Sequence, residues 1–368
     1  MTRPDSHSLS KASMTLLSRL LLGSSKGVGA LLPADPEMRG ELDRLSRDEF
    51  DNLIALAQSN HVVIRGLQVA AGVTQNVALR ELAESALATE RARIDTAIRY
   101  LSEICEAFEV QGLGIAVIKS LDHWPDLGSD LDLYSDADAG EIRKLMKSRF
   151  KASIAPRSWG DRLAGKWNFI VPGLPEAVEI HMGRLGQTGE QLEIASNLLR
   201  RTRQVNIGAF SFRVASVSDR LIISTLQRMY RHFYFRLCDI VDSAELAQSG
   251  AIEYAELRFL ATSAGIWEGV ATYLAIVSDY VRSFRGQGLE LPEFVTASAR
   301  FGGNQIYYKR EFLRVPILPQ SARLFGAQLA GVLGRGNIQS GARLSLLPWL
   351  ATAAVVGQKL TGSDKGIW

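Results

Sequence analysis

The spacing of apolar residues changes twice along this chain, and each change of spacing requires a change of secondary structure. Up to about Gly112, apolar side chains recur three and four residues apart, most clearly in "ALRELAESALATERARIDTAIRYLSEICEAFEVQG", which is typical of a long amphipathic helix. Shorter runs follow, namely "GIAVIKS", "DLDLYS", "KWNFIVPG", "AVEIHMG" and "FSFRVAS". They are β-branched or alternate apolar with polar residues, as strands do because residues two apart share a face. From Val217 the helical spacing returns.

We therefore predict an α+β fold in which a small mixed sheet is flanked by helices on both sides of the sequence. The predicted regions are an N-terminal helical region at 1–111, a core at 112–216 and a C-terminal helical region at 217–368. The stretch 216–250 is predicted as helix, whereas the Gly/Pro-punctuated stretch 301–320 interrupts the helical pattern. A chain of 368 residues is long enough for one large domain or two to three smaller ones.

Composition and charge give no support for a nucleic-acid-binding protein or for one stabilised by disulfides or zinc. Apolar residues make up 46% and charged residues 22%, as in an ordinary globular protein. A net charge of +3 gives no general case for nucleic-acid binding, and we interpret the basic runs "RKLMKSRFK" and "RRTR" as solvated surface. The two cysteines, Cys105 and Cys238, supply neither a disulfide framework nor a zinc site, which suits a reducing cytoplasm.

Two apolar runs need a check for membrane contact. "LLSRLLLG" near the N-terminus is short and broken by Arg19, so it fails as a spanning helix and is a poor signal peptide. "LSLLPWLATAAVVG", at 344–357, is also too short and contains Pro348. We predict no membrane span, and we interpret the second run as a core helix or a partner surface.

An acidic pair stands inside the alternating run "DLGSDLDLYSD". On a strand, Asp130 and Asp132 point to one face while Leu131 and Leu133 take the opposite, buried face. Two carboxylates that close repel each other, and a divalent cation is the usual compensation, since hard Mg²⁺ takes oxygen ligands. The alternative interpretation is a polar strand end that runs into an acidic surface turn.

A third carboxylate lies on a later predicted strand. Glu179 is flanked by Val178 and Ile180, so it faces away from the apolar side as the two aspartates do. Three carboxylates on one face of neighbouring strands suit a metal-assisted transfer, in which an acid can also activate a hydroxyl. Upstream, Lys119 and Ser120 end the preceding strand at a tight turn, which is a plausible seat for phosphate.

This ordered set resembles a known superfamily. Lys119-Ser120, the acid pair after nine intervening residues and Glu179 on a later strand resemble the signature of the DNA polymerase β-like nucleotidyltransferase superfamily. That signature is a strand, a Gly/Ser turn, a DxD strand and a third acid. More narrowly, the chain resembles the bacterial "uncharacterised nucleotidyltransferase" family, whose members read roughly LKG…DxDLL…DLH. The resemblance covers about residues 50–290. The matching segments are "LIALAQSNHVVIRGLQVA", "GIAVIKSLDHW", "SDLDLYSD", "VEIHMGRL" and "RMYRHFYFRLCDIVDSAEL", the last with Asp239.

The resemblance implies a nucleotidyltransferase core at 112–216. It implies that Mg²⁺, or Mn²⁺, binds to Asp130 and Asp132, and that Glu179 completes the ligands of a second metal or serves as base. An NTP, with ATP as the expected one, would donate its NMP group to a hydroxyl of a small molecule, a protein side chain or a tRNA end. The oligomeric state stays open. The implied nucleotide contacts are Lys119, Ser120, Ser129 and His181.

The sequence departs from the family pattern at three places. Ser120 stands where the family has glycine, "DLGSD" lacks the arginine that customarily precedes the acid pair, and the third acid is Glu179 rather than aspartate. These departures favour an alternative, a nucleotide-binding or partner-binding module on the same fold that no longer catalyses. A metal-dependent phosphodiesterase would need more histidine ligands than the five scattered histidines supply.

Other polar residues have two interpretations. His232, Arg236 and Asp239 fall on one face of the helix predicted after residue 216, and we interpret them as a solvated or ion-paired stripe rather than as a cleft lining. Asp122 and His123 lie in the loop between the turn and the acid pair, where they could contact a nucleotide.

Overall fold

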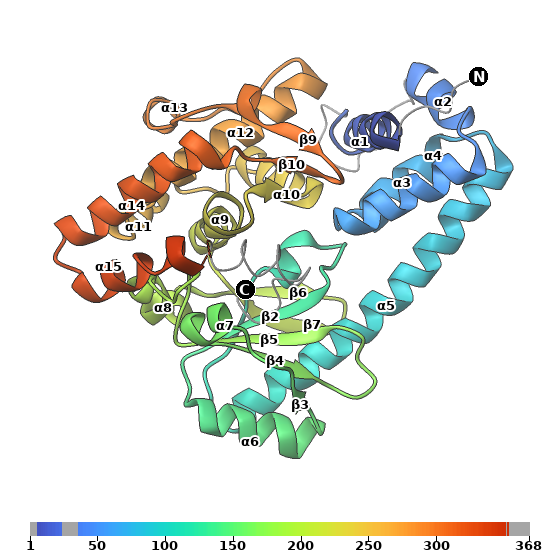
Figure 1. Ribbon diagram of the computed structural model, residues 1–368. Coiled ribbons are helices and arrows are strands. Elements are labelled where there is room, and N and C mark those ends of the chain that lie inside the picture. Colours follow the sequence, from blue (N-terminus) through green and yellow to red (C-terminus); the bar gives the residue numbers. More distant parts are fainter. Residues whose placement is uncertain (1–5, 24–35, 351, 353–368) are drawn as a thin grey trace.

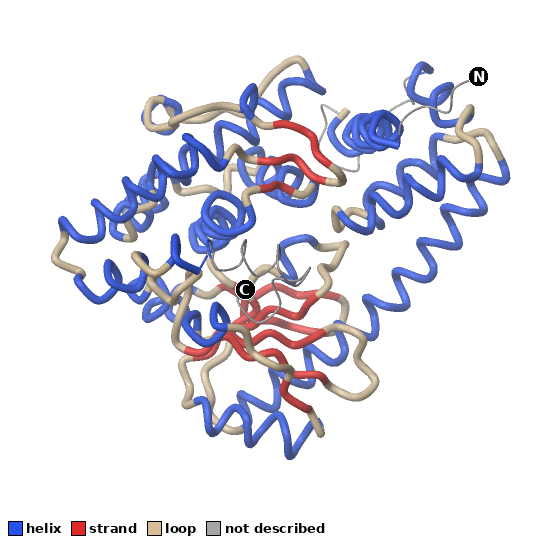
Figure 2. The backbone as a smooth tube through the Cα atoms, in the orientation of Figure 1, coloured by secondary structure: helices blue, strands red, loops and turns tan. Residues whose placement is uncertain are grey.

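The computed structural model describes residues 6–23, 36–350 and 352, and it confirms the predicted α+β class. A seven-stranded mixed sheet lies between helices from both ends of the chain (Figures 1 and 2). In Figure 1, α6 lies on one side of this sheet, and the C-terminal helices lie on the other.

Two of the N-terminal helices, α3 and α5, begin at residues whose side chains satisfy free backbone amides. Ser46 and Glu49 form a reciprocal capping box at the start of α3, and the Asn76 side chain accepts from the first amides of α5. Gly112 has a φ of +69° just after α5, a conformation that glycine adopts without strain. The helices are α1 (Ser6–Leu22), α2 (Pro36–Asp43), α3 (Arg47–Ser59), α4 (Val63–Val73) and α5 (Val77–Val110).

The large sheet has the order β3-β4-β5-β2-β1-β7-β6. Its central pair, β2 and β5, is parallel, as is β1 with β7, while the other neighbours are antiparallel. The strands are β1 (Ala116–Val117), β2 (Asp130–Ser135), β3 (Ser153–Ile154), β4 (Lys166–Ile170), β5 (Ala177–Met182), β6 (Arg203–Ile207) and β7 (Phe210–Val214). Between them lie the 3-10 turns η1 (Ser120–His123) and η2 (Leu199–Arg201), and α6 (Ala139–Phe150), α7 (Trp159–Ala164) and α8 (Leu192–Leu198).

The single helix predicted over 216–250 is wrong, because the chain breaks it in the middle. α9 (Val217–Thr225) continues as the π-helical turn η3 (Leu226–His232), and Phe233 then takes a left-handed backbone conformation. The next two residues form β8 (Tyr234–Phe235), which pairs with a strand far downstream, and the ring of Tyr234 stacks on Phe312 at 4.4 Å between centroids. This long-range pairing overrides the local helical preference.

The C-terminal region is mostly helical but also holds a small sheet of order β8-β10-β9, which was not predicted. β9 and β10 lie in the stretch 301–320, where the helical pattern is interrupted, whereas β8 follows η3. The remaining elements are α10 (Leu237–Gln248), α11 (Tyr254–Ser263), α12 (Trp267–Arg285), α13 (Glu293–Thr296), η4 (Gly303–Gln305), β9 (Tyr307–Lys309), β10 (Phe312–Arg314), η5 (Ile317–Ser321), α14 (Ala322–Gly334) and α15 (Ile338–Leu344).

Among the helices that the structure describes, none combines the length and apolar character that a bilayer crossing needs. Of the apolar run 344–357, residue 351 and everything from 353 onward lie outside the described residues.

A buried ion network joins the three regions of the sequence. Arg65 on α4 donates from Nε to Asp126 Oδ2 at 2.8 Å and from Nη1 to Asp242 Oδ1 at 2.6 Å. Asp126 precedes β2, and Asp242 lies on α10. The three side chains are 5%, 1% and 8% exposed, so each charge depends on the others for compensation.

We predict that Arg65→Met lowers the free energy of unfolding by about 3–5 kcal/mol, because it leaves two carboxylates buried without their cation. Urea titration followed by circular dichroism measures the change. Arg99→Met is the matched control, since Arg99 forms an exposed pair with Glu103 and its loss should cost at most about 1 kcal/mol. Equal losses in the two variants would show that the buried network does not stabilise the fold.

Candidate active site

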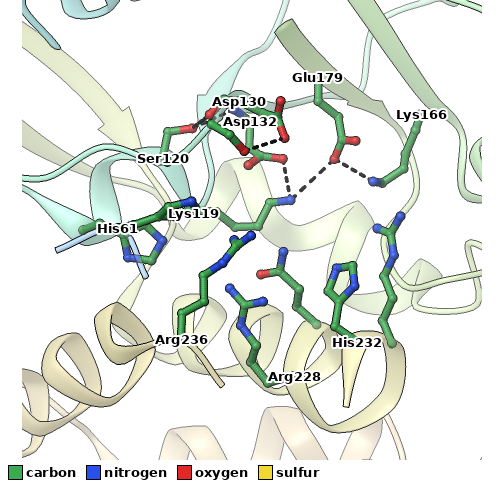
Figure 3. Close-up of a pocket in the computed structure, with 15 residues that line it drawn as sticks. His61, Lys119, Ser120, Asp130, Asp132, Lys166, Glu179, Arg228, His232 and Arg236 are labelled. Carbon is green, nitrogen blue, oxygen red and sulfur yellow. Dashed lines mark hydrogen bonds and ion pairs between the residues drawn. The ribbon is translucent and has the colours of Figure 1, made fainter. Parts of the chain in front are cut away.

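Strand pairing brings the acidic residues together. In the parallel register of β2 and β5, Asp132 lies directly opposite Glu179. Leu131, Leu133, Val178 and Ile180, which alternate with the acids, are fully buried on the other face. The side chains of Asp130, Asp132 and Glu179 line one pocket. Figure 3 shows their carboxylates at its upper wall.

The acids do not contribute equally to a potential metal site. One ligand atom each from Asp132, Glu179 and His181 lies within 4.8 Å of the other two. Asp130 is not in this group, and its carboxylate accepts a bond of 3.4 Å from Ser129 Oγ. The pKa of the Asp130 carboxyl is raised, first by partial burial and then by the charges of Asp132 and Glu179.

Two lysines neutralise the opposed carboxylates. The Lys119 ammonium is ion-paired with Asp132 and lies 3.5 Å from Glu179 Oε1, and Lys166 Nζ lies 2.6 Å from the same oxygen. His181 Nε2 is 2.9 Å from it. Although burial alone would raise it, the pKa of Glu179 is held well below its ordinary value by Lys166, Lys119 and His181. Burial and then the charge of Arg231 lower the pKa of Lys166 to about 8.

Lys119 and Ser120 stand at the turn where the sequence predicts them. Lys119 has a φ of +66°, a conformation uncommon for a residue with a side chain, and it directs its ammonium at the acids. The Ser120 hydroxyl donates to the Asp130 carbonyl at 3.2 Å and accepts from the Asp132 amide at 2.7 Å. Ser120 therefore anchors the start of β2.

The opposite wall is cationic, and the sequence analysis did not predict it as a site. Arg228, Arg231 and His232 on η3, with Arg236 before α10, line the pocket (Figure 3). Arg228 is paired with Asp239 at 2.7 Å, whereas no ion pair to the guanidinium of Arg231 or Arg236 occurs within the described ranges. The available signal was the clustering of cations in "QRMYRHFYFR", where Arg228, His232 and Arg236 are four residues apart, but the sequence alone did not show that they face a pocket.

The predicted stripe of His232, Arg236 and Asp239 on one helix is wrong, because the chain breaks at Phe233 between its members. Asp239 is ion-paired, as interpreted, but His232 and Arg236 line the pocket. Burial and the neighbouring Arg231 hold the pKa of His232 well below its ordinary value, so the imidazole is neutral.

The polar residues of η1 and of the loop after it have partners other than Asp130, Asp132 and Glu179. Asp122 pairs with Arg220 at 2.7 Å, and Asp126 pairs with Arg65, so neither is the partner of Lys119. His123 lies at the pocket wall, with Nδ1 2.5 Å from Asp242. Burial alone would lower the pKa of His123, but its neighbours Cys238 and Asp242 raise it well above its ordinary value.

The pocket extends in two directions. Its cavity of about 150 Å³ shares His61, Gly128 and Ser129 with a neighbouring cavity of about 300 Å³ between α3, α5 and the loop before β2. On the other side it shares Lys119 and Arg231 with a smaller cavity that His181 lines. Of the predicted nucleotide contacts, Lys119, Ser120 and Ser129 thus line the main pocket, and His181 lies beside it.

Comparison with known proteins assigns no family. No protein-family model matches the chain, and no curated protein matches its sequence. What the site can do follows from its own geometry, in which a row of carboxylates faces a row of guanidinium groups across a solvent-accessible pocket.

We predict that Lys166→Met raises the pKa of Glu179 toward its ordinary value, because Lys166 is the largest charge that lowers it. A carboxyl with a lowered pKa adds stability above pH 4.5 that is lost as the pH falls toward the folded-state pKa, so the variant should also lose less stability on acidification.

Carbon NMR of labelled glutamate carboxyls in chelator-treated protein measures this shift. Lys144→Met, on the exposed face of α6, is the control and should leave Glu179 unchanged. An unshifted Glu179 in Lys166→Met would refute the dependence on Lys166.

Proposed function

We propose that this chain is a metal-dependent nucleotidyltransferase of the bacterial family and polymerase β-like superfamily that its motifs resemble. It would bind an NTP, with ATP as the expected donor, and transfer the NMP group to an acceptor hydroxyl. The observation that carries this proposal is the parallel pairing that sets Asp132 opposite Glu179, with the cationic wall of η3 across the same pocket. Carboxylates on one side suit a cation, and guanidinium groups on the other suit phosphates.

The donor set fits Mg²⁺ or Mn²⁺. Asp132, Glu179 and Asp130 supply the oxygen ligands that such hard cations prefer. When bound, the metal would polarise the reacting phosphate and lower the cost of deprotonating the acceptor hydroxyl. Lys119 supplies positive charge to the same carboxylates in the metal-free protein, so the metal would replace it as their counter-charge.

Side chains of the pocket would bind the phosphates, hold the metal and accept the proton of the hydroxyl. Despite burial, the pKa of Lys119 is raised by Asp132 and Glu179, so its ammonium stays charged and can turn toward phosphate. Arg231 and Arg236 offer forked donors for the polyphosphate. Glu179, with its low pKa, suits metal ligation better than proton transfer. Asp130, with its raised pKa, is the better proton acceptor for the hydroxyl.

The cavity beside Gly128 has room for the acceptor, which we propose is a small molecule, a protein side chain or a tRNA end. We propose the cytoplasm as the location, in keeping with the free, buried Cys105 and Cys238.

A second function is favoured by one observation. Lys119 and Lys166 together already compensate the charges of Asp132 and Glu179. A module that binds nucleotide phosphates on the cationic wall without metal, and does not catalyse, would keep this arrangement. Nucleotide binding that is independent of Mg²⁺ would favour this function over transfer.

We predict that the double variant Asp130→Asn/Asp132→Asn loses Mg²⁺-dependent NTP binding and transfer but keeps its fold, because it removes metal ligands rather than core packing. Calorimetric titration with Mg-NTP and transfer of labelled NMP measure the two activities. Asp95→Asn, on an exposed position of α5, is the matched control. Parental Mg-NTP affinity in the double variant would exclude the metal site.

We predict that Lys119→Met weakens Mg-NTP binding by about 1.5–3 kcal/mol, the contribution of a hydrogen bond to a charged group. Lys119→Arg should be partly tolerated, since it keeps the charge but changes its geometry. Calorimetry gives the affinities and thermal unfolding gives the stability. Unchanged affinity with a lowered melting temperature in Lys119→Met would instead assign Lys119 a purely structural role against Asp132 and Glu179.

A further inference from the structure

A second cluster of potential ligands lies at the other end of the pocket, away from the carboxylate row. His61 lies between α3 and α4, His123 ends η1, and Cys238 is in the first turn of α10. One ring nitrogen of each histidine and Cys238 Sγ all lie within 4.8 Å of one another. These three residues come from three distant parts of the sequence, so no sequence spacing indicates them.

The geometry around His123 is that of a supported metal ligand. Nδ1 lies 2.5 Å from Asp242, so the carboxylate orients the ring and directs Nε2 to Cys238 Sγ at 3.8 Å. Zinc bonds of ~2.0–2.1 Å to nitrogen and ~2.3 Å to sulfur, at a tetrahedral angle, place those two atoms ~3.6 Å apart. The observed separation therefore needs only a small adjustment.

His61 contributes two independent observations. Its Nδ1 is buried and has no hydrogen-bond partner, which is uncommon for a buried polar atom. Its backbone φ is +53°, a left-handed conformation that few residues with side chains adopt and that often marks a functional constraint.

The charges around this cluster are compatible with a bound cation. Asp242 is next to His123, and Asp239 follows Cys238 directly. Arg228 is paired with Asp239, whereas Arg65 is shared between Asp242 and Asp126, so these three acids carry one more charge than their two arginines. Binding of a divalent ion would release the thiol proton of Cys238 and the Nε2 proton of His123, leaving a single positive charge on the three-ligand centre.

The geometry points to a zinc-type site: we infer that His61, His123 and Cys238 bind one Zn²⁺ or a similar borderline cation. His61 and His123 both line the pocket, so the fourth ligand position opens toward it. This set of nitrogen and sulfur ligands is distinct from the oxygen-rich group at Asp132 and Glu179, because softer ligands select zinc and carboxylates select magnesium. On this inference Cys238 is a zinc ligand, whereas the sequence predicts no zinc site for either cysteine.

The bound ion would connect the N-terminal helices, the loop before β2 and α10 around the pocket. The inference goes beyond the proposed transferase and does not depend on it. Asp132→Asn should leave zinc binding unchanged, whereas it removes the oxygen-ligand site, so the two proposals fail separately.

Cobalt titration of the full chain, stripped of metal by a chelator, tests the inference. The parent should bind Co²⁺ with a thiolate-to-cobalt charge-transfer band and the intense visible bands of tetrahedral cobalt, and one equivalent of Zn²⁺ should abolish these bands. Cys238→Ala should lose the charge-transfer band and weaken Zn²⁺ binding by at least the roughly 100-fold upper range seen for loss of a supporting residue. Cys105→Ala, which removes the other buried free cysteine, is the matched control and should behave as the parent.

The spectrum of the parent protein does not depend on the folding of any variant. His61→Gln, at a partly exposed position, gives a second variant that should weaken Zn²⁺ binding while the charge-transfer band persists. Absence of a thiolate band in the parent, or equal Zn²⁺ affinity in Cys238→Ala and Cys105→Ala, would overturn the inference.

Discussion

One buried guanidinium holds together the parts of the chain that form the pocket. Arg65 on α4 binds Asp126 before β2 and Asp242 on α10, and all three side chains are nearly inaccessible to water. Asp126 also accepts from the amide of Ile64 at 2.6 Å, and Asp242 contacts His123. Because each buried charge needs its partner, a shift of either wall of the pocket would leave a carboxylate uncompensated. The Arg65 network therefore holds the two walls of the pocket in place relative to each other.

Across the pocket, opposite charges face each other from different parts of the fold. Asp132 and Glu179 belong to the central sheet, whereas Arg231 and Arg236 belong to the segment that follows α9. Lys119 and Lys166 compensate the acids locally, so the guanidinium groups keep their capacity for an anion. A ligand that combines a divalent cation with phosphates complements both walls at once, which is the physical reason for preferring Mg-NTP to either component alone.

The cationic wall lies where a helix stops early. After the π-helical turn, Phe233 leaves the helical conformation, and Tyr234 pairs and stacks with β10 some eighty residues downstream. Such turns interrupt regular helices at functional sites, because they change which side chains share a face. Here Arg228 and His232 before the interruption and Arg236 after it line the same pocket.

The sequence alone determined the features that depend on neighbours along the chain. The change from helical to alternating spacing predicted the α+β class and the extent of α5, and alternation predicted that Asp130, Asp132 and Glu179 turn away from a buried face. Only the tertiary structure decided that Glu179 lies opposite Asp132, that Lys166 pairs with Glu179, and that Cys238 lies near two histidines. Strand register, a broken helix and a cluster drawn from three regions all depend on contacts between residues distant in sequence. Local spacing carries no information about such contacts, because they form only when the whole core packs.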